Sequence, residues 1–195
     1  IAFDSKSETG WHEVSRVGRD ALGAAGGVVT GKKDKPRSLL PPPLPAGTAV
    51  DDVDPKSSTY SRTFNTVAMP KAGDELHHFG WNACSSCLCP NAPHPHVERR
   101  YLGVPGLRSS RIHILDTKAD PRKPEIVKVI EPAEVAERAG YTRPHTVHCG
   151  PEAIYVAALG NAEGKRPGGV FLMDHESFDI RGRWEIDRGE QELAF

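Results

Sequence analysis

The amino-acid sequence predicts an all-β protein made of repeated antiparallel units, and three observations lead to this prediction. An apolar strand ending in an aspartate, a short polar turn and a second apolar strand recur along the chain of 195 residues. The aspartates are Asp54, Asp116 and Asp174, so the copies are spaced by 62 and 58 residues. The second and third copies each follow another strand with a tyrosine at a matching place, Tyr101 and Tyr155. A unit of this length is near the ~40–50 residues of a β-propeller blade, with insertions.

Residues 1–48 are expected to be a divergent, disordered tail, and residues 49–195 to be part of a β-propeller. The first segment is rich in Gly, Lys, Ser and Pro and closes with GKKDKPRSLLPPPLPAGT. Proline removes backbone donors and favours polyproline II, so this composition is typical of a linker or tail. The boundary follows from the change in composition at about Ala49.

The three repeated units read AVDDVDPKSSTYSRTFNTVAMP, IHILDTKADPRKPEIVKVIEP and VFLMDHESFDIRGRWEIDRG. Their β-branched and aromatic residues favour strands, and Asp, Pro, Ser and Gly favour the turns between them. A repeated unit cannot bury its own apolar face, so neighbouring units must stack beside it. The chain would hold about three to four blades of a propeller. A β-sandwich is the alternative, because alternating strands are common to both folds.

One short helix is predicted between Glu131 and Gly140, over the residues PAEVAERA. Pro132 is tolerated in the first helical turn, and Ala, Glu and Arg favour helix. Gly140 is placed to end the helix, because glycine readily adopts the left-handed conformation of a C-cap. The helix would lie in an insertion that leads to a second group of histidines.

The charge balance and the hydropathy pattern argue against a nucleic-acid partner and against a membrane span. Lys and Arg number 25 against 26 Asp and Glu, and the formal net charge of −1 offers no basic field for a nucleic-acid backbone. No apolar run approaches the roughly 20 residues that a membrane span requires. We therefore expect a protein without a nucleic-acid partner or a membrane span, located in the cytoplasm, with the periplasm as the alternative.

Three of the four cysteines and two adjacent histidines gather in GDELHHFGWNACSSCLCP, residues 73–90. Four cysteines are too few for a disulfide scaffold, so their clustering points to chemistry or metal binding. Cys84 and Cys87 have the CxxC spacing, which can form a disulfide, hold a metal or act as a redox dithiol. Packing in the core is the fourth alternative, because cysteine is often buried.

Four histidines could form one metal site: His77 and His78 in this segment, and His145 and His148 in RPHTVHCG. Adjacent rings diverge in a strand, so the first pair would reach one ion only from a bulge or loop. Histidines three apart point to opposite faces of a strand and would meet only on a turn. Each pair could instead be hydrogen-bonded polar residues at a sheet end. Imidazole suits Cu, Zn, Fe and Ni, whereas thiolate favours Zn or Cu(I).

Six segments together resemble the selenium-binding protein family, whose members include methanethiol oxidases. They are VDPKSSTY, MPKAGDELHHFGWNACSSC, SSRIHILDT, KVIEP, RPHTVHC and GRWEIDRG, of which DELHHFGWNACSSC is highly specific. The resemblance covers roughly residues 50–195 and implies a seven-bladed β-propeller. Family members continue for several more blades, so we expect the chain to be the N-terminal portion of a longer protein, without the ligands that later blades supply.

The resemblance also implies an activity and a cofactor. The family's oxidases convert methanethiol, O2 and water to formaldehyde, hydrogen sulfide and hydrogen peroxide, and bacterial members depend on copper. His77 and His78 match the paired histidines of the family motif, and His145 and His148 match its second histidine group. All four are therefore candidate copper ligands.

The remaining assignments from the resemblance concern sulfur and selenium. Cys84 and Cys87 match the motif cysteines and are candidates for thiol redox catalysis or metal binding. Animal members attribute selenium binding to a cysteine just after the VDPKSxxY motif, where this chain has Ser61. The expected function is a copper-dependent methanethiol oxidase, with a non-catalytic selenium- or metal-binding propeller scaffold as the alternative.

Overall fold

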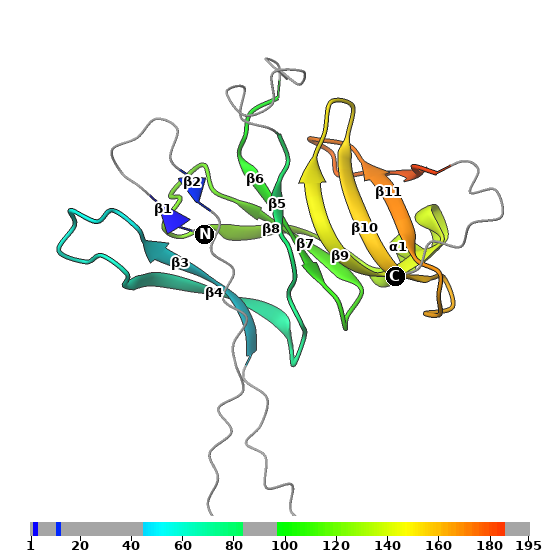
Figure 1. Cartoon of the computed structure of the whole chain (residues 1–195), viewed down its shortest axis with the longest axis horizontal. Helices are drawn as coiled ribbons and strands as arrows, with labels where there is room; N and C mark the ends of the chain where they lie inside the picture. The colour runs from blue at the N-terminus through cyan, green and yellow to red at the C-terminus, as the bar shows by residue number, and fades with distance from the viewer. Residues whose placement is uncertain (1, 4–10, 13–44, 84–96, 186–195) are drawn as a thin grey trace, which may run out of the picture.

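The computed structural model describes residues 2–3, 11–12, 45–83 and 97–185, and these form three four-stranded sheets and one helix (Figure 1). The predicted all-β class is confirmed. The predicted pair Cys84 and Cys87 lies outside the described residues.

The first sheet is built around the first repeated unit. Its strands follow the order β2-β1-β3-β4. They are β1 (Ala2–Phe3), β2 (Trp11–His12), β3 (Pro45–Asp52) and β4 (Thr63–Ala72). β3 and β4 are antiparallel, whereas β1 pairs with β3 in parallel. Two short strands therefore lie in the segment that its composition predicts to be a tail, and β3 begins shortly before the expected boundary at residue 49.

The second and third sheets are antiparallel meanders of four consecutive strands, as the repeats predict. The second sheet contains β5 (Gly80–Trp81), β6 (Tyr101–Gly106), β7 (Arg111–Asp116) and β8 (Glu125–Ile130). The third contains β9 (Tyr141–Cys149), β10 (Ile154–Asn161), β11 (Gly169–Met173) and β12 (Ile180–Arg183). Tyr101 begins β6 and Tyr155 lies near the start of β10, so the matching tyrosines occupy equivalent strands.

The three repeated aspartates perform the same local task. Asp54, Asp116 and Asp174 each accept a hydrogen bond through Oδ1 from the backbone N–H two residues further on, at 2.9 Å in every case. This Asx-turn redirects the chain where the apolar strand ends. The repeat in the sequence therefore corresponds to a repeated turn in the structure.

The predicted helix is present as α1 (Pro132–Ala139), between β8 and β9. Pro132 opens it, and Gly140 ends it in the left-handed conformation at φ 68°, with its N–H donating to the Ala136 carbonyl. Val135 and Ala139 are buried and join the core beneath the third sheet. The helix is confirmed with the ends that the sequence predicts.

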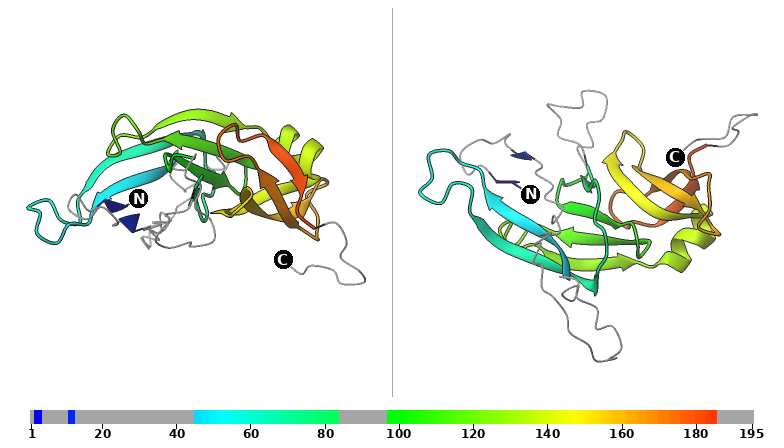
Figure 2. Two further views of the ribbon diagram at one scale, coloured as in Figure 1. Left: turned by 90° about the horizontal axis from the view of Figure 1, so that it is seen from above. Right: turned by 60° about the horizontal axis from the view of Figure 1, so that its bottom comes forward.

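Two hydrophobic clusters connect the three sheets, which follow one another in space (Figure 2). One cluster lies between the second and third sheets and includes Ile112, Ile114 and Phe171. The other includes Met69 of β4 and Leu102 of β6 and lies between the first and second sheets. The middle sheet is thus covered on both faces, as in a stack of propeller blades and unlike a two-layer sandwich. A closed ring of seven blades stays a prediction.

The helix in the described part of the chain is too short to cross a membrane. α1 is eight residues long, and within the described ranges no helix combines the length and hydropathy that crossing a bilayer requires.

Candidate metal centre

The paired histidines lie in the extended segment between β4 and β5, and this segment pairs with strands of both the second and the third sheet. Leu76 forms an antiparallel bridge with Gly106 of β6, and His78 forms a parallel bridge with Thr146 of β9. The His77 N–H donates to the Pro105 carbonyl at 3.2 Å. His77 and His78 shortly precede β5, and RPHTVHC lies in β9, so the two histidine groups lie at the first strands of two neighbouring sheets.

Gly80 allows this close approach of the two sheets. A Cβ at this position would lie 2.1 Å from the carbonyl oxygen of Val147 in β9, closer than any side chain permits. The buried ring of Phe79, one residue earlier, packs into the cluster between the first and second sheets. The Val147 N–H donates to the His78 carbonyl at 2.8 Å. In the motif HHFG, Phe79 therefore anchors the two histidines in the core, and Gly80 lets the segment lie against β9.

His145 reaches the site from a β-bulge. Thr146 pairs with Ala157 of β10 and Pro144 pairs with Ala158, so His145 is an extra residue with no partner in this register. A bulge re-aims a side chain that strict alternation would direct elsewhere. The bulge places the His145 ring beside the histidine pair.

The three-histidine cluster consists of His77, His78 and His145. The ring centroids of His77 and His145 are 4.2 Å apart, and those of His78 and His145 are 5.1 Å apart. One potential ligand atom from each residue lies within 4.8 Å of the other two. Nitrogens bound to one ion at about 2.0–2.1 Å lie at most about 4 Å apart, so small rotations would close the site. The donor set therefore fits a transition-metal ion.

His148 is not brought into this cluster. β9 stays extended from His145 through Cys149, whereas the two rings could meet at one ion only if this segment formed a turn. The His148 ring is exposed, and its Nδ1 lies 2.6 Å from the carbonyl oxygen of Cys149. The described geometry favours three ligands from this chain, and a role for His148 at the ion stays a prediction.

The electrostatics of the cluster suit metal binding. Burial lowers the pKa of His145, and the neighbouring charges of His77 and His78 lower this pKa further. The ring is therefore held toward its neutral form, which is the form that binds metals. Hydrogen bonds from His77 and then Arg108 lower the pKa of Glu75, so this carboxyl stays ionised beside the cluster.

Two polar residues of the site are absent from the sequence-based prediction. Glu75 Oε1 lies 2.8 Å from Nε2 of His77, and Thr146 Oγ1 lies 2.9 Å from Nδ1 of His145. Metal-binding histidines commonly have such a partner on the second ring nitrogen. The sequence signal that could have identified Glu75 is the position of a carboxylate two residues before the histidine pair.

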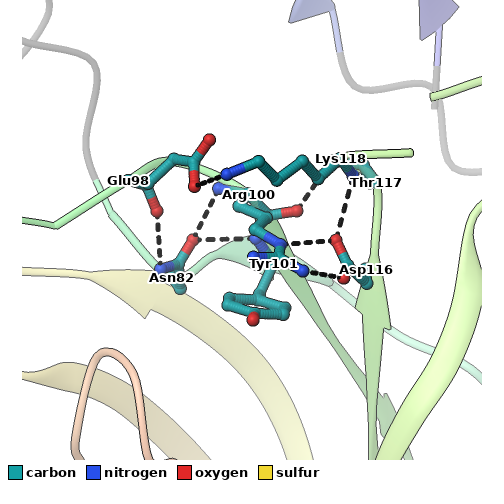
Figure 3. A network of polar contacts seen from close by, with 7 residues as sticks. All are labelled: Asn82, Glu98, Arg100, Tyr101, Asp116, Thr117 and Lys118. Carbon is teal, nitrogen blue, oxygen red and sulfur yellow. Dashed lines mark hydrogen bonds and ion pairs between the residues drawn. The ribbon is translucent and has the colours of Figure 1, made fainter. Parts of the chain in front are cut away.

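Asn82 holds together the two ends of the segment that contains Cys84 and Cys87 (Figure 3). Its Nδ2 donates to the Glu98 carbonyl and to the His175 carbonyl, each at 3.0 Å. Its Oδ1 accepts from the backbone N–H groups of Arg100 and Tyr101, at 3.1 and 3.0 Å. The chain on both sides of the cysteine segment is therefore fixed by one buried side chain.

Comparison with known proteins gives the same family as the sequence motifs. Residues 43–195 match the family model described as 56 kDa selenium binding protein (SBP56). The chain is 46% identical over 140 residues to "Selenium-binding protein 3" of Arabidopsis thaliana, covering 71% of this chain and 28% of that protein. It is 44% identical over 148 residues to a "Methanethiol oxidase" of Xenopus laevis, covering 75% of this chain and 30% of that protein.

A solved structure gives further support. The X-ray structure of a hypothetical selenium-binding protein from Sulfolobus tokodaii matches with a TM-score of 0.70 and 63% sequence identity. The match covers 76% of this chain and 32% of that protein. The chain thus spans less than a third of the length of these relatives. On the family model, the relatives and the structure together, this chain belongs to the selenium-binding protein family.

Proposed function

We propose that this chain contributes the metal site of a copper-dependent thiol oxidase of the methanethiol oxidase type. The observation that carries the proposal is the convergence of His77, His78 and His145 from two neighbouring sheets. Relatives named methanethiol oxidase, 39–44% identical to this chain, support a small thiol as the substrate. The whole reaction belongs to the longer protein, because the chain spans about 30% of these relatives.

Copper is the proposed ion because imidazole is among its preferred ligands, and a soft Cu(I) site also attracts thiolate. Bound copper would supply one-electron redox chemistry and a binding position for the sulfur of the substrate. Three protein ligands leave a further coordination position, as catalytic metal sites require. His78 is the most exposed of the three histidines, so its side of the cluster is open to an entering thiol.

The histidines of this chain would bind and orient rather than react. The rings of the three-histidine cluster would hold the ion through their unprotonated nitrogens, and the bulge in β9 fixes the direction of His145. The net reaction consumes methanethiol, O2 and water and yields formaldehyde, hydrogen sulfide and hydrogen peroxide, which balances in atoms and electrons. Cys84 and Cys87 are proposed as a redox thiol pair that serves the same site.

The test uses the chain extended to the full length of its relatives. Purified protein is loaded with copper, and methanethiol-dependent release of peroxide and formaldehyde is measured in parallel with bound copper. His145→Ala should lose bound copper, and its rate should fall by at least about 100-fold. Mutation of a residue that only supports a ligand already costs about 10–100-fold in metal affinity, so loss of the ligand itself should cost at least as much. Asn161→Ala, which alters a turn remote from the cluster, should change neither measurement.

The alternative is a selenium- or metal-binding scaffold without turnover, and the names of the Arabidopsis and Sulfolobus relatives favour it. Stoichiometric copper without peroxide formation in the full-length protein would support the scaffold. Ser61 lies in the turn after β3 and is exposed, at the position where animal members carry the selenium-linked cysteine. Selenite binding that appears only in Ser61→Cys would place selenium binding outside the native role of this chain.

A further inference from the structure

Glu75 connects a member of the three-histidine cluster to the turn between β6 and β7. Its Oε1 lies 2.8 Å from Nε2 of His77, and its Oε2 lies 3.0 Å from Nε of Arg108. Both carboxylate oxygens are therefore used, one toward the cluster and one toward a cation. This pattern differs from an isolated surface ion pair, because the first contact is to a candidate ligand.

The contact between Glu75 and His77 determines which ring nitrogen faces the ion. An ionised carboxylate only accepts hydrogen bonds, so Nε2 of His77 must carry the proton. Nδ1 then keeps the lone pair that can bind a metal. We propose that Glu75 is a positioning residue that holds His77 in the Nε2–H tautomer and leaves Nδ1 to the shared ion. This inference rests on the metal site of the proposed function.

Glu75 is itself held in place before any ion binds. Oδ1 of Asp74 accepts hydrogen bonds from the backbone N–H groups of Glu75, Arg108 and Ser109, at 2.9, 3.2 and 3.0 Å. Oδ2 of Asp74 is hydrogen-bonded to the Ser109 hydroxyl. The Leu107 N–H donates to the Glu75 carbonyl at 2.7 Å. The turn between β6 and β7 thus fixes the backbone that presents the Glu75 carboxylate.

His145 has a different kind of partner, which makes the effect of Glu75 specific to His77. Nδ1 of His145 lies 2.9 Å from the Thr146 hydroxyl, which can donate or accept. A hydroxyl does not impose a tautomer, whereas a carboxylate does. Charge on the partner also raises the basicity of the ligand through the ring. His77 is therefore expected to be a stronger metal ligand than His145.

The tautomer can be tested in the metal-free chain by 15N NMR of the histidine rings at pH 7.5, with His77 assigned by its loss in His77→Ala. Wild-type His77 should show a protonated Nε2 and an unprotonated Nδ1. Glu75→Ala should shift His77 toward a mixture of tautomers and leave His113 unchanged. Glu131→Ala is the matched control, because Glu131 pairs with Nε of Arg111 at 2.9 Å and is not part of the three-histidine cluster. A protonated Nδ1 in the wild type would overturn the proposal.

The consequence for the ion is tested by titrating the chain with Cu(II) against a chromophoric chelator, without substrate. Glu75→Ala should weaken Cu(II) binding by about 10–100-fold. Glu75→Gln keeps the shape and an acceptor oxygen but lacks the charge, so its affinity should lie between those of wild type and Glu75→Ala. Glu131→Ala should bind as the wild type does. Circular dichroism of all variants checks that the sheets are intact.

The outcomes separate this inference from the proposed function. Equal affinities for Glu75→Ala and Glu131→Ala would overturn the role of Glu75 and leave the metal site standing. A wild-type chain that binds no Cu(II) would overturn the metal site and the role of Glu75 toward it. Failure of the full-length protein to oxidise methanethiol would contradict only the proposed function, because neither measurement here uses substrate.

Discussion

Gly80 sets the distance between the histidine pair and β9. Its absent side chain lets the chain lie against the Val147 carbonyl, where a Cβ would be 2.1 Å away. His78 pairs with Thr146 through the same contact. The geometry of the cluster therefore depends on a residue that has no chemistry of its own.

Gly80→Ala should destabilise the protein by about 1–3 kcal/mol, because the two backbones must move apart to admit a methyl group. It should also weaken Cu(II) binding, since His77 and His78 would move away from His145. Denaturant unfolding and copper titration measure the two effects. Gly103→Ala is the control, because its Cβ would meet the Val147 side chain at 3.1 Å, which can shift. Equal losses in the two variants would contradict this account of Gly80.

His113 is a buried histidine in β7 that the candidate site does not use. Its side chain is fully buried, and among the described residues neither ring nitrogen has a hydrogen-bond partner. The Val104 backbone lies beside the ring without hydrogen-bonding geometry. Burial lowers the pKa of His113 below its usual value of 6.5.

His113→Leu should make the protein less sensitive to acid. The folded state disfavours the charged ring, so below about pH 6.5 the unfolded chain binds more protons and the wild type loses stability as the pH falls. The variant lacks this loss, and at pH 7 it should be as stable as the wild type or more so, because unpaired buried atoms are removed. Urea unfolding from pH 7.5 to 5 gives the comparison. The same slope against pH in both proteins would contradict the prediction.

At the scale of elements, the strands and the helix follow from local patterns in the sequence. The repeated aspartates mark strand ends, and α1 begins at Pro132 and ends before Gly140 as its capping residues predict. The bulge at His145 could not be predicted in the same way, because strict alternation gives no register and the pairing with β10 sets it. Pro144 was a hint, since proline inside a sheet is confined to edges and bulges.

The ends of β5 and β6 are joined by Asn82, and Asn82→Ala tests this connection. Four hydrogen bonds to backbone groups would be lost from a side chain that is 2% exposed. We expect a loss of about 2–4 kcal/mol, because buried donors and acceptors are left unmatched. The amides of Arg100 and Tyr101 should exchange faster with D2O. Asn161→Ala, whose Oδ1 serves a hairpin turn, should cost about 1 kcal/mol or less.

At the scale of the whole molecule, the histidines meet because successive sheets stack beside one another. The repeat in the sequence predicts this stacking, and the middle sheet is covered on both faces. The partners within the cluster could be predicted only in part. The sequence motifs suggested four histidines as ligands, but the direction of each ring depends on the bulge in β9 and on the contact at Gly80, which are products of the packing between sheets.

The central claim is that three histidines from two neighbouring sheets bind one metal ion, and copper stoichiometry tests it most directly. After copper loading and dialysis, the wild-type chain should retain about one Cu(II) ion, as expected for one shared site. His77→Ala and His145→Ala should retain far less, whereas His148→Ala should retain as much as the wild type. Loss of copper from His148→Ala with retention in His145→Ala, or a wild-type chain without bound copper, would contradict the account.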